Sequence, residues 1–202
     1  MMTIHRLMTA SFFCATLVSG LTPVFALDVA QVPTSKRTKP GLYLDVKEAY
    51  EMKQQQGDKV LFVDIRTRGE ITYTGVATSV DAYVPMYEHP PNAAWDEKAG
   101  RFQLELNKDF EKEIVRRANA KGLSKSDPIV LICRSGDRSG RAATQLSEAG
   151  FAQVYTVVDG FEGDVAKEGP NAGKRVVNGW KNAGLPWSYR LEKEKFTLPE
   201  PR

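Results

Sequence analysis

The sequence predicts an α/β fold, with an open, mostly parallel sheet and helices on both of its faces. Two continuous apolar runs, 60–63 and 129–132, indicate strands that are buried on both sides, as is typical of parallel sheets. Segments with helical spacing of apolar residues alternate with these strands along the chain. A chain of 202 residues is long enough for one domain with extensions.

The predicted domain begins with a short strand and a capped helix. Residues 42–44 are apolar and predict the strand. Asp45 can cap the helix that follows, and Glu48, three residues later, completes a capping-box pattern. Gly57 is a typical helix end, and the buried strand 60–63 comes next.

The rest of the domain continues this alternation. Residues 83–84 indicate another short strand, and apolar side chains four residues apart predict a helix over 107–120. The buried strand 129–132 leads into a helix expected over 138–149. A strand at 154–158 is the last one predicted for the sheet.

Residues 1–26 have the pattern of a secretory signal peptide. Arg6 supplies positive charge, residues 7–21 are mostly apolar, and residues 24–26 offer a cleavage site before Leu27. The alternative is an uncleaved membrane anchor, but the apolar run is short for a span and contains small and polar residues. We therefore expect an exported, periplasmic protein with no membrane association after cleavage.

Three parts are expected in the mature chain. Residues 27–40 carry prolines and a cluster of basic residues and are interpreted as an exposed, solvated linker. The folded domain is expected over 41–190, followed by a C-terminal tail at 191–202. Within the domain, the glycine-rich residues 164–178 are interpreted as a surface loop.

Composition excludes several classes of function. The 28 Lys and Arg residues exceed the 25 Asp and Glu residues by only +3, which is too little to indicate nucleic acid as a partner. Two histidines argue against a His-based zinc site or a Ser-His-Asp triad, and we expect no metal and no cofactor. Signal cleavage would remove Cys14 and leave Cys133 as the only thiol, so no internal disulfide could form.

The loop after strand 129–132 is the most informative motif. Cys133 is followed by two glycines and three arginines, in the order Arg134, Ser135, Gly136, Asp137, Arg138, Ser139, Gly140, Arg141. A loop that enters a helix N-terminus can turn its N–H groups toward an anion, and the helix dipole and arginines add positive charge. Such surroundings favour a thiolate, which predicts an exposed, reactive nucleophile that needs no general base. The alternative, an inert buried cysteine, leaves this cluster of arginines and glycines unexplained.

This loop resembles the active-site loop of the rhodanese family of sulfurtransferases. Further similarities extend over about residues 41–190, in four places: Phe62-Val63-Asp64-Ile65-Arg66 with the acidic Glu70 after it, the strand 154–158 with Asp159-Gly160-Phe161, Gly179-Trp180, and Ala183-Gly184-Leu185-Pro186-Trp187. The resemblance implies a rhodanese-like, open, mostly parallel sheet.

The resemblance also implies a reaction. Cys133 would take a sulfane sulfur from a small anionic donor such as thiosulfate, release sulfite and carry the sulfur as a persulfide. The acceptor would be cyanide or a thiol, including a protein thiol. By the same resemblance, the substrate-binding residues are Arg134, Ser135, Gly136, Asp137 and Arg138, and the supporting residues are Asp64, Arg66 and Ser139. Arg138 is expected to close the loop and to attract the donor.

Two alternatives stay open. Many domains that resemble rhodanese act without turnover, so this chain could be a sulfur carrier or docking module for an exported partner. A cysteine phosphatase or arsenate reductase is disfavoured, because those loops place five residues between cysteine and arginine, whereas four separate Cys133 from Arg138. A loop with fewer amides is better matched to a sulfur atom than to a tetrahedral phosphate.

Overall fold

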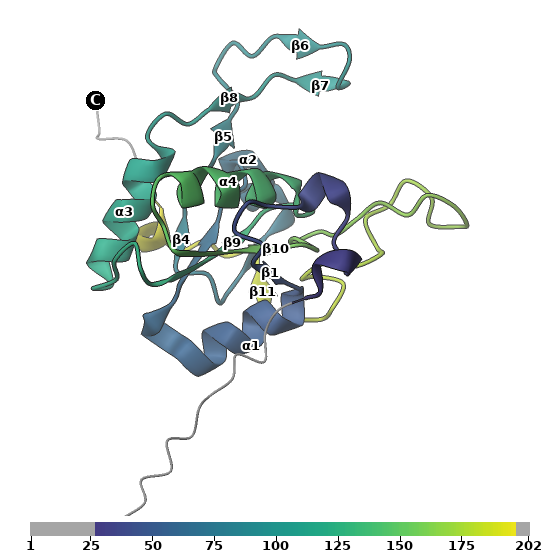
Figure 1. Cartoon of the computed structure of the whole chain (residues 1–202). Coiled ribbons are helices and arrows are strands. Elements are labelled where there is room, and N and C mark those ends of the chain that lie inside the picture. Colours follow the sequence, from purple (N-terminus) through teal and green to yellow (C-terminus); the bar gives the residue numbers. More distant parts are fainter. Residues whose placement is uncertain (1–26, 197–202) are drawn as a thin grey trace, which may run out of the picture.

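The computed structural model describes residues 27–196 (Figure 1). The predicted signal peptide and the end of the predicted tail lie outside these residues. Within this part, no helix is long and apolar enough to cross a membrane.

A five-stranded parallel sheet forms the centre of the domain, which confirms the predicted fold class. Its strand order is β1-β10-β9-β2-β4, and every neighbouring pair is parallel. The strands are β1 (Tyr43–Leu44), β2 (Leu61–Asp64), β4 (Ala82–Tyr83), β9 (Pro128–Ile132) and β10 (Gln153–Val157).

The helices lie on both faces of this sheet. Asp45 begins the first helix through the predicted capping box, in which its carboxylate accepts from the Glu48 amide and the Glu48 carboxylate accepts from the Asp45 amide, both at 2.8 Å. Gly57 ends that helix as expected. The helices are α1 (Val46–Gln56), α2 (Arg68–Thr74), α3 (Phe110–Ala120) and α4 (Asp137–Glu148), with 3₁₀ turns at Val29–Gln31, Thr34–Lys36, Gly57–Lys59 and Lys193–Lys195.

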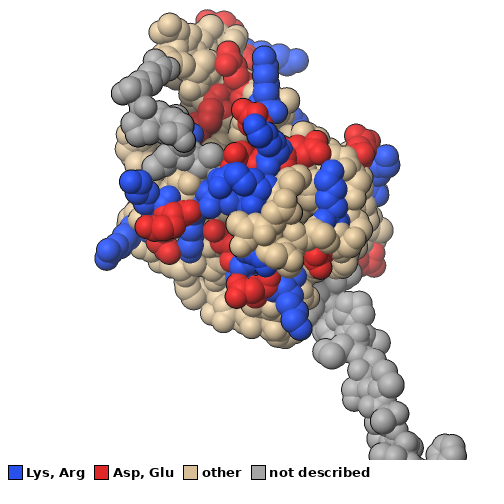
Figure 2. Space-filling view, turned by 90° about the vertical axis from the view of Figure 1, so that its left-hand side faces the viewer, with Lys and Arg blue, Asp and Glu red and all other residues tan. Residues whose placement is uncertain are grey.

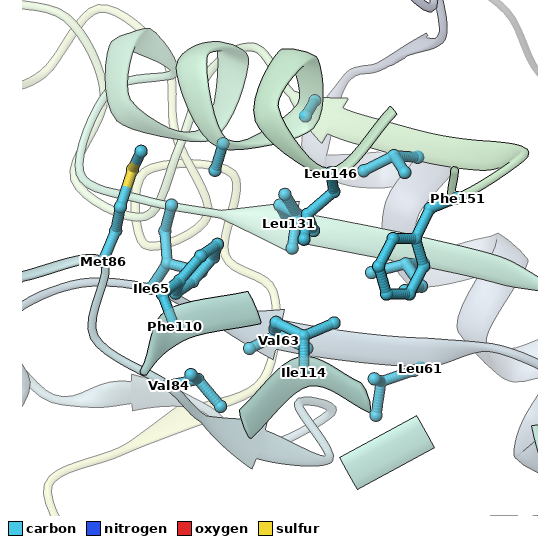
Figure 3. Packing of buried hydrophobic residues seen from close by; sticks show 14 of the residues in the cluster. Leu61, Val63, Ile65, Val84, Met86, Phe110, Ile114, Leu131, Leu146 and Phe151 are labelled. Carbon is cyan, nitrogen blue, oxygen red and sulfur yellow. The ribbon is translucent and has the colours of Figure 1, made fainter. Parts of the chain in front are cut away.

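The apolar strands divide their side chains between two cores, because successive residues of a strand point to opposite faces. Leu61 and Val63 of β2 pack with Leu131 of β9 against α3 and α4, as Figure 3 shows. The alternate residues, such as Phe62 and Ile132, pack on the other face with α1 and Trp180. Burial of both faces explains why these strands read as continuous apolar runs.

An arm projects from one end of the sheet, and the sequence analysis did not predict it (Figure 1). It spans residues 87–106 and consists of two successive antiparallel pairs. At its base, β5 (Tyr87–Glu88) pairs with β8 (Glu105–Leu106), and at its tip β6 (Trp95–Asp96) pairs with β7 (Arg101–Phe102). These two-residue strands are too short to show a clear alternation in the sequence.

Residues 27–40 are not the exposed linker that we expected. Val32 is buried in a small cluster with Tyr43 and Val158. The Lys36 side chain is also buried, and its ammonium donates to the Val158 carbonyl at 3.0 Å and to the Asp164 carboxylate at 2.8 Å. The prediction was wrong because a lysine without an acidic residue nearby in the sequence is expected to be solvated. The partner of Lys36, Asp164, lies 128 residues away in the chain.

The C-terminal part closes the second core. Trp180 is fully buried, and its indole donates to the Pro186 carbonyl at 2.9 Å. The last strand, β11 (Trp187–Ser188), pairs antiparallel with β3 (Val76–Ala77). Residues 164–178 form the predicted surface loop, with Val177 60% exposed at its end.

The surface carries charges of both signs. Figure 2 shows basic and acidic side chains next to one another on the face it presents. Ion pairs of the described residues include Arg116–Glu113 at 2.9 Å and Lys121–Asp58 at 2.6 Å.

Candidate active site

Cys133 lies between β9 and α4, at the carboxyl end of a central strand. Ligands of parallel α/β sheets bind outside these strand ends. The residue is only 1% exposed, so the expectation of an exposed thiol was wrong. Its side chain belongs to the core cluster on the α3 and α4 face, because it continues the alternation of β9.

The sulfur atom of Cys133 is held by two polar contacts. The Gly136 amide donates to Sγ at 3.2 Å, and Sγ lies 3.5 Å from the Ser139 hydroxyl. That hydroxyl donates to the Gly136 carbonyl at 3.0 Å and accepts from Thr156 at 2.7 Å. The Ser139 hydroxyl therefore links the sulfur of Cys133 to the Gly136 carbonyl and to Thr156. The sequence did not indicate Thr156 as part of the site.

Two glycines give the loop its shape. Gly136 has a φ of 92°, a left-handed conformation that side chains rarely adopt, and a Cβ there would clash with the Val158 carbonyl. Gly160, with a φ of 69°, follows β10, and a Cβ there would clash with the backbone of Arg134 and Ser135. The loop and the turn after β10 thus touch backbone to backbone, and the Phe161 amide donates to the Cys133 carbonyl at 2.8 Å.

The start of α4 adds positive potential to the loop. The helix begins at Asp137, so the amides of its first turn have no acceptor inside the helix. The dipole of this 12-residue helix directs its positive end toward the same place. The start of α4 can therefore stabilise a bound anion.

Arg138 closes the loop by binding Glu70. Its guanidinium donates to both Glu70 oxygens, at 2.7 and 2.5 Å. Burial raises the pKa of Glu70, but the hydrogen bonds and charge of Arg138 outweigh it and lower that pKa to about 2. Burial lowers the pKa of Arg138, but Glu70 and the nearby Cys133 raise it above its usual value. Glu70 therefore neutralises much of the charge of Arg138. In the sequence, Glu70 was identified only as the acidic residue that follows the Asp64–Arg66 motif.

A hollow of about 490 Å³ opens beside the loop. The loop contributes Ser135 and Asp137, whose side chains are 3.2 Å apart, and Arg138. The arm supplies the opposite side, which the sequence gave no signal for. The lining residues are Tyr87, Asp96, Arg101, Gln103, Leu104, Arg134, Ser135, Asp137, Arg138 and Arg141.

Asp64 and Arg66 lie outside the lining of this hollow. They form a fully buried ion pair at 2.6 Å. Arg66 also donates to the Gly75 carbonyl at 2.8 Å, and its guanidinium stacks on Phe161 at 4.0 Å from the ring centre. The pair adjoins the active-site loop through Phe161, whose amide donates to the Cys133 carbonyl, and through the pairing of Asp64 with Ile132. Its supporting role stays a prediction.

Comparisons with known proteins agree with this architecture. Two uncharacterized rickettsial proteins are similar to the chain: one from Rickettsia conorii is 32% identical over 142 residues, which are 70% of this chain and 93% of that protein. The other, from Rickettsia prowazekii, is 31% identical over 132 residues, or 65% and 85% of the two chains. The crystal structure of Rv0390 from M. tuberculosis matches with a TM-score of 0.55 and 29% identity, and the match covers 73% of this chain and 97% of that one.

A sequence model of one family matches more than half of the chain. It is described as the rhodanese-like domain, and it covers residues 45–167, from the cap of α1 to the loop after β10. These residues contain the parallel sheet except for β1, together with the cysteine loop and the arm. The chain therefore belongs to the rhodanese-like domain family.

Proposed function

We propose that this protein is a sulfurtransferase that carries sulfur as a persulfide on Cys133. The observation that carries the proposal is the position of Sγ, which accepts from the Gly136 amide at the start of α4. Family membership supports sulfur transfer as the class of chemistry. Thiosulfate is the donor to test first, because a small dianion is suited to amides and guanidinium groups.

The proposed reaction is two displacements at sulfur. The Cys133 thiolate attacks the outer sulfur of thiosulfate, a new S–S bond forms, and the old one breaks with its electron pair leaving on sulfite. A thiolate or cyanide then attacks the outer sulfur of the persulfide, and the electron pair returns to Sγ. No external oxidant or reductant is needed, and no side chain has to act as a general base.

The direct test is the intact mass of the mature protein after exposure to thiosulfate. We expect a gain of one sulfur atom that cyanide reverses with formation of thiocyanate. Cys133→Ser should not gain the sulfur, although serine can keep the hydrogen bond from Gly136. Unchanged melting of that variant would show that the loss is chemical. A wild-type protein that gains no sulfur from thiosulfate or from a persulfide donor would overturn the proposal.

A carrier for a protein partner is the second candidate, and the arm favours it. Trp95 is 49% exposed and Phe102 is 56% exposed, at the tip of the arm beside the hollow. Exposed aromatic side chains are frequent at protein interfaces. Loading of Cys133 by a protein persulfide, without turnover of free thiosulfate and cyanide, would identify the carrier.

We also propose that the chain is exported to the periplasm and matures at Leu27. The support is the signal-peptide pattern before Leu27. Leu27 itself packs against the cluster formed by Val32 and Tyr43, and its amide donates to the Tyr43 carbonyl at 3.3 Å. N-terminal sequencing of native protein should begin within a residue or two of Leu27. A membrane-bound chain that retains Met1 would be an anchored protein instead.

A further inference from the structure

The hollow beside the cysteine loop is larger than an inorganic sulfur donor requires. Its volume of about 490 Å³ falls within the range of about 300–1,000 Å³ typical of sites for organic ligands. A water molecule takes up about 30 Å³ of liquid, so thiosulfate would fill only a small part of this space. The residues that line this space come from the loop, from α4 and from the arm.

Three guanidinium groups around this space are available to a ligand. Among residues 27–196, neither Arg101 nor Arg141 forms an ion pair, and Arg134 reaches Glu70 only at 3.9 Å. The Nε atom of Arg134 is buried and has no hydrogen-bond partner among these residues. That atom faces Glu70, whose carboxylate Arg138 already binds at 2.7 and 2.5 Å, so Arg134 has no close ion-pair partner among these residues.

Among residues 27–196, the two acidic side chains of the lining, Asp96 and Asp137, form no ion pair with these arginines. The carboxylate of Asp96 accepts from the Ala99 amide at 3.0 Å. The carboxylate of Asp137 accepts from the Ser135 hydroxyl at 3.2 Å. Both are engaged within their own segments, whereas Arg101 reaches the hollow from the arm and Arg141 from α4.

We propose that the second substrate of this site is an organic thiol that carries carboxylates, and that Arg101 of the arm selects it. This inference rests on the proposed function. One end of the acceptor reaches the sulfur of Cys133, and its carboxylates bind the guanidinium groups of Arg101, Arg134 and Arg141. Cyanide and neutral thiols lack these contacts and react only by virtue of their nucleophilicity.

The transfer step balances without a further reagent. The outer sulfur of the persulfide stands one S–S bond, about 2 Å, beyond Sγ. The acceptor thiolate attacks that sulfur, the bond to Sγ breaks, and the electron pair returns to Cys133. The acceptor leaves as a persulfide that keeps its carboxylates, and the arginines contribute by positioning it.

The test compares two acceptors with the same thiol, one with free carboxylates and one with both carboxylates esterified. Glutathione, a tripeptide thiol with two carboxylates, and its diethyl ester would be used to discharge protein loaded with sulfur. We expect glutathione to discharge it about 10-fold faster at equal thiolate concentration and low salt, with the preference shrinking as salt is added. Arg101→Ala should reduce the preference for glutathione over its diethyl ester about 3- to 10-fold.

Lys98→Ala is the matched control, because Lys98 is an exposed cation on the same arm and does not line the hollow. It should keep the full preference for glutathione. The inference is overturned if the two acceptors react equally with the wild type, if Arg101→Ala keeps the preference, or if Lys98→Ala loses it equally, since the last result would reflect net charge alone.

A binding measurement separates this inference from the proposed function. S-methylglutathione cannot accept sulfur, and its binding to Cys133→Ser requires no persulfide. Calorimetric binding that Arg101→Ala weakens would support recognition of a carboxylated thiol by Arg101 independently of sulfur loading. Sulfur loading without any binding of S-methylglutathione overturns the inference and leaves the sulfurtransferase proposal intact.

Discussion

The cysteine loop and the arm line the same hollow but are held in the molecule in different ways. The loop follows a buried strand, and backbone atoms on several sides fix it, including the Val158 carbonyl and the amide of Phe161. The arm is joined to the body through strands of two residues, and its tip is exposed. We infer from this difference that the two regions have separate roles, a division of labour in the sense that the loop fixes the position of the sulfur and the arm selects the molecules that reach it.

The largest effect on sulfur loading is expected from the substitution Gly136→Ala, which adds a methyl group in the cysteine loop. Gly136→Ala places a side chain in a left-handed conformation against the Val158 carbonyl. Backbone strain of about 1–3 kcal/mol should slow sulfur loading about 10- to 100-fold. Rapid-quench mass spectrometry with thiosulfate would measure it.

Gly100→Ala is the control for this comparison. Gly100 also has a positive φ of 60°, but it lies at the tip of the arm, where an added Cβ meets no atom within 4 Å. Loading should stay within about twofold of the wild type, because the strain does not reach the sulfur. Equal losses in both variants would contradict the division of labour.

Removing the charge of Glu70 should have the next largest effect. Glu70→Gln can keep the capping hydrogen bond from the Thr67 amide but leaves the largely buried Arg138 without its carboxylate. We expect a loss of about 2–3 kcal/mol of unfolding free energy at pH 7 and roughly tenfold slower loading. Urea unfolding and single-turnover loading would measure the two losses.

The stability difference between wild type and Glu70→Gln should also depend on pH. The pKa of Glu70 falls from 4.5 to about 2 on folding, so its contribution is fully present above pH 4.5. It is lost as the pH falls through about 2, because both states then bind the proton. Unfolding measured at several pH values between 2 and 7 should show the two proteins converging; a constant difference would mean that Arg138 does not depend on the charge of Glu70.

A smaller effect is expected behind the loop, where residues 27–40 pack. Lys36→Met removes the ammonium that binds the Val158 carbonyl and Asp164, and should cost about 1–3 kcal/mol of unfolding free energy. Lys39→Met is the matched control, because the Lys39 side chain is 62% exposed and its ion pair with Glu148 is 3.4 Å long. Its cost should stay below about 0.5 kcal/mol. Similar melting temperatures for the two variants would restore the interpretation of this segment as a solvated linker.

The smallest effect on stability is expected at the tip of the arm. Trp95 packs edge-on against Phe102 at 5.4 Å, but both rings are about half exposed. Trp95→Ala should change the unfolding free energy by no more than about 0.5 kcal/mol and leave loading by thiosulfate unchanged. A defect in sulfur delivery from or to a protein, measured with a protein persulfide, would show that the tip serves a protein partner.

Patterns local in the sequence predicted the body of the fold well. The capping box of Asp45 and Glu48, the helix end at Gly57 and the apolar runs of β2 and β9 are all determined by residues close together in the chain. The helix predicted to start at residue 107 begins at Phe110, because residues 107–109 connect the end of the arm to the helix. The arm itself was missed, since its strands are too short for a periodic pattern and its residues are mostly exposed.

The sequence by itself determined the chemistry available at the site: one thiol among residues 27–202, at a strand-to-helix junction, followed at once by glycines and arginines. Only the tertiary structure decided how that chemistry is used. It joined Arg138 to Glu70 over 68 positions, buried Lys36 against Asp164 over 128 positions, and brought Arg101 to the hollow. Pairing between charges depends on distance in space and on burial, and no local pattern in a sequence records either of them.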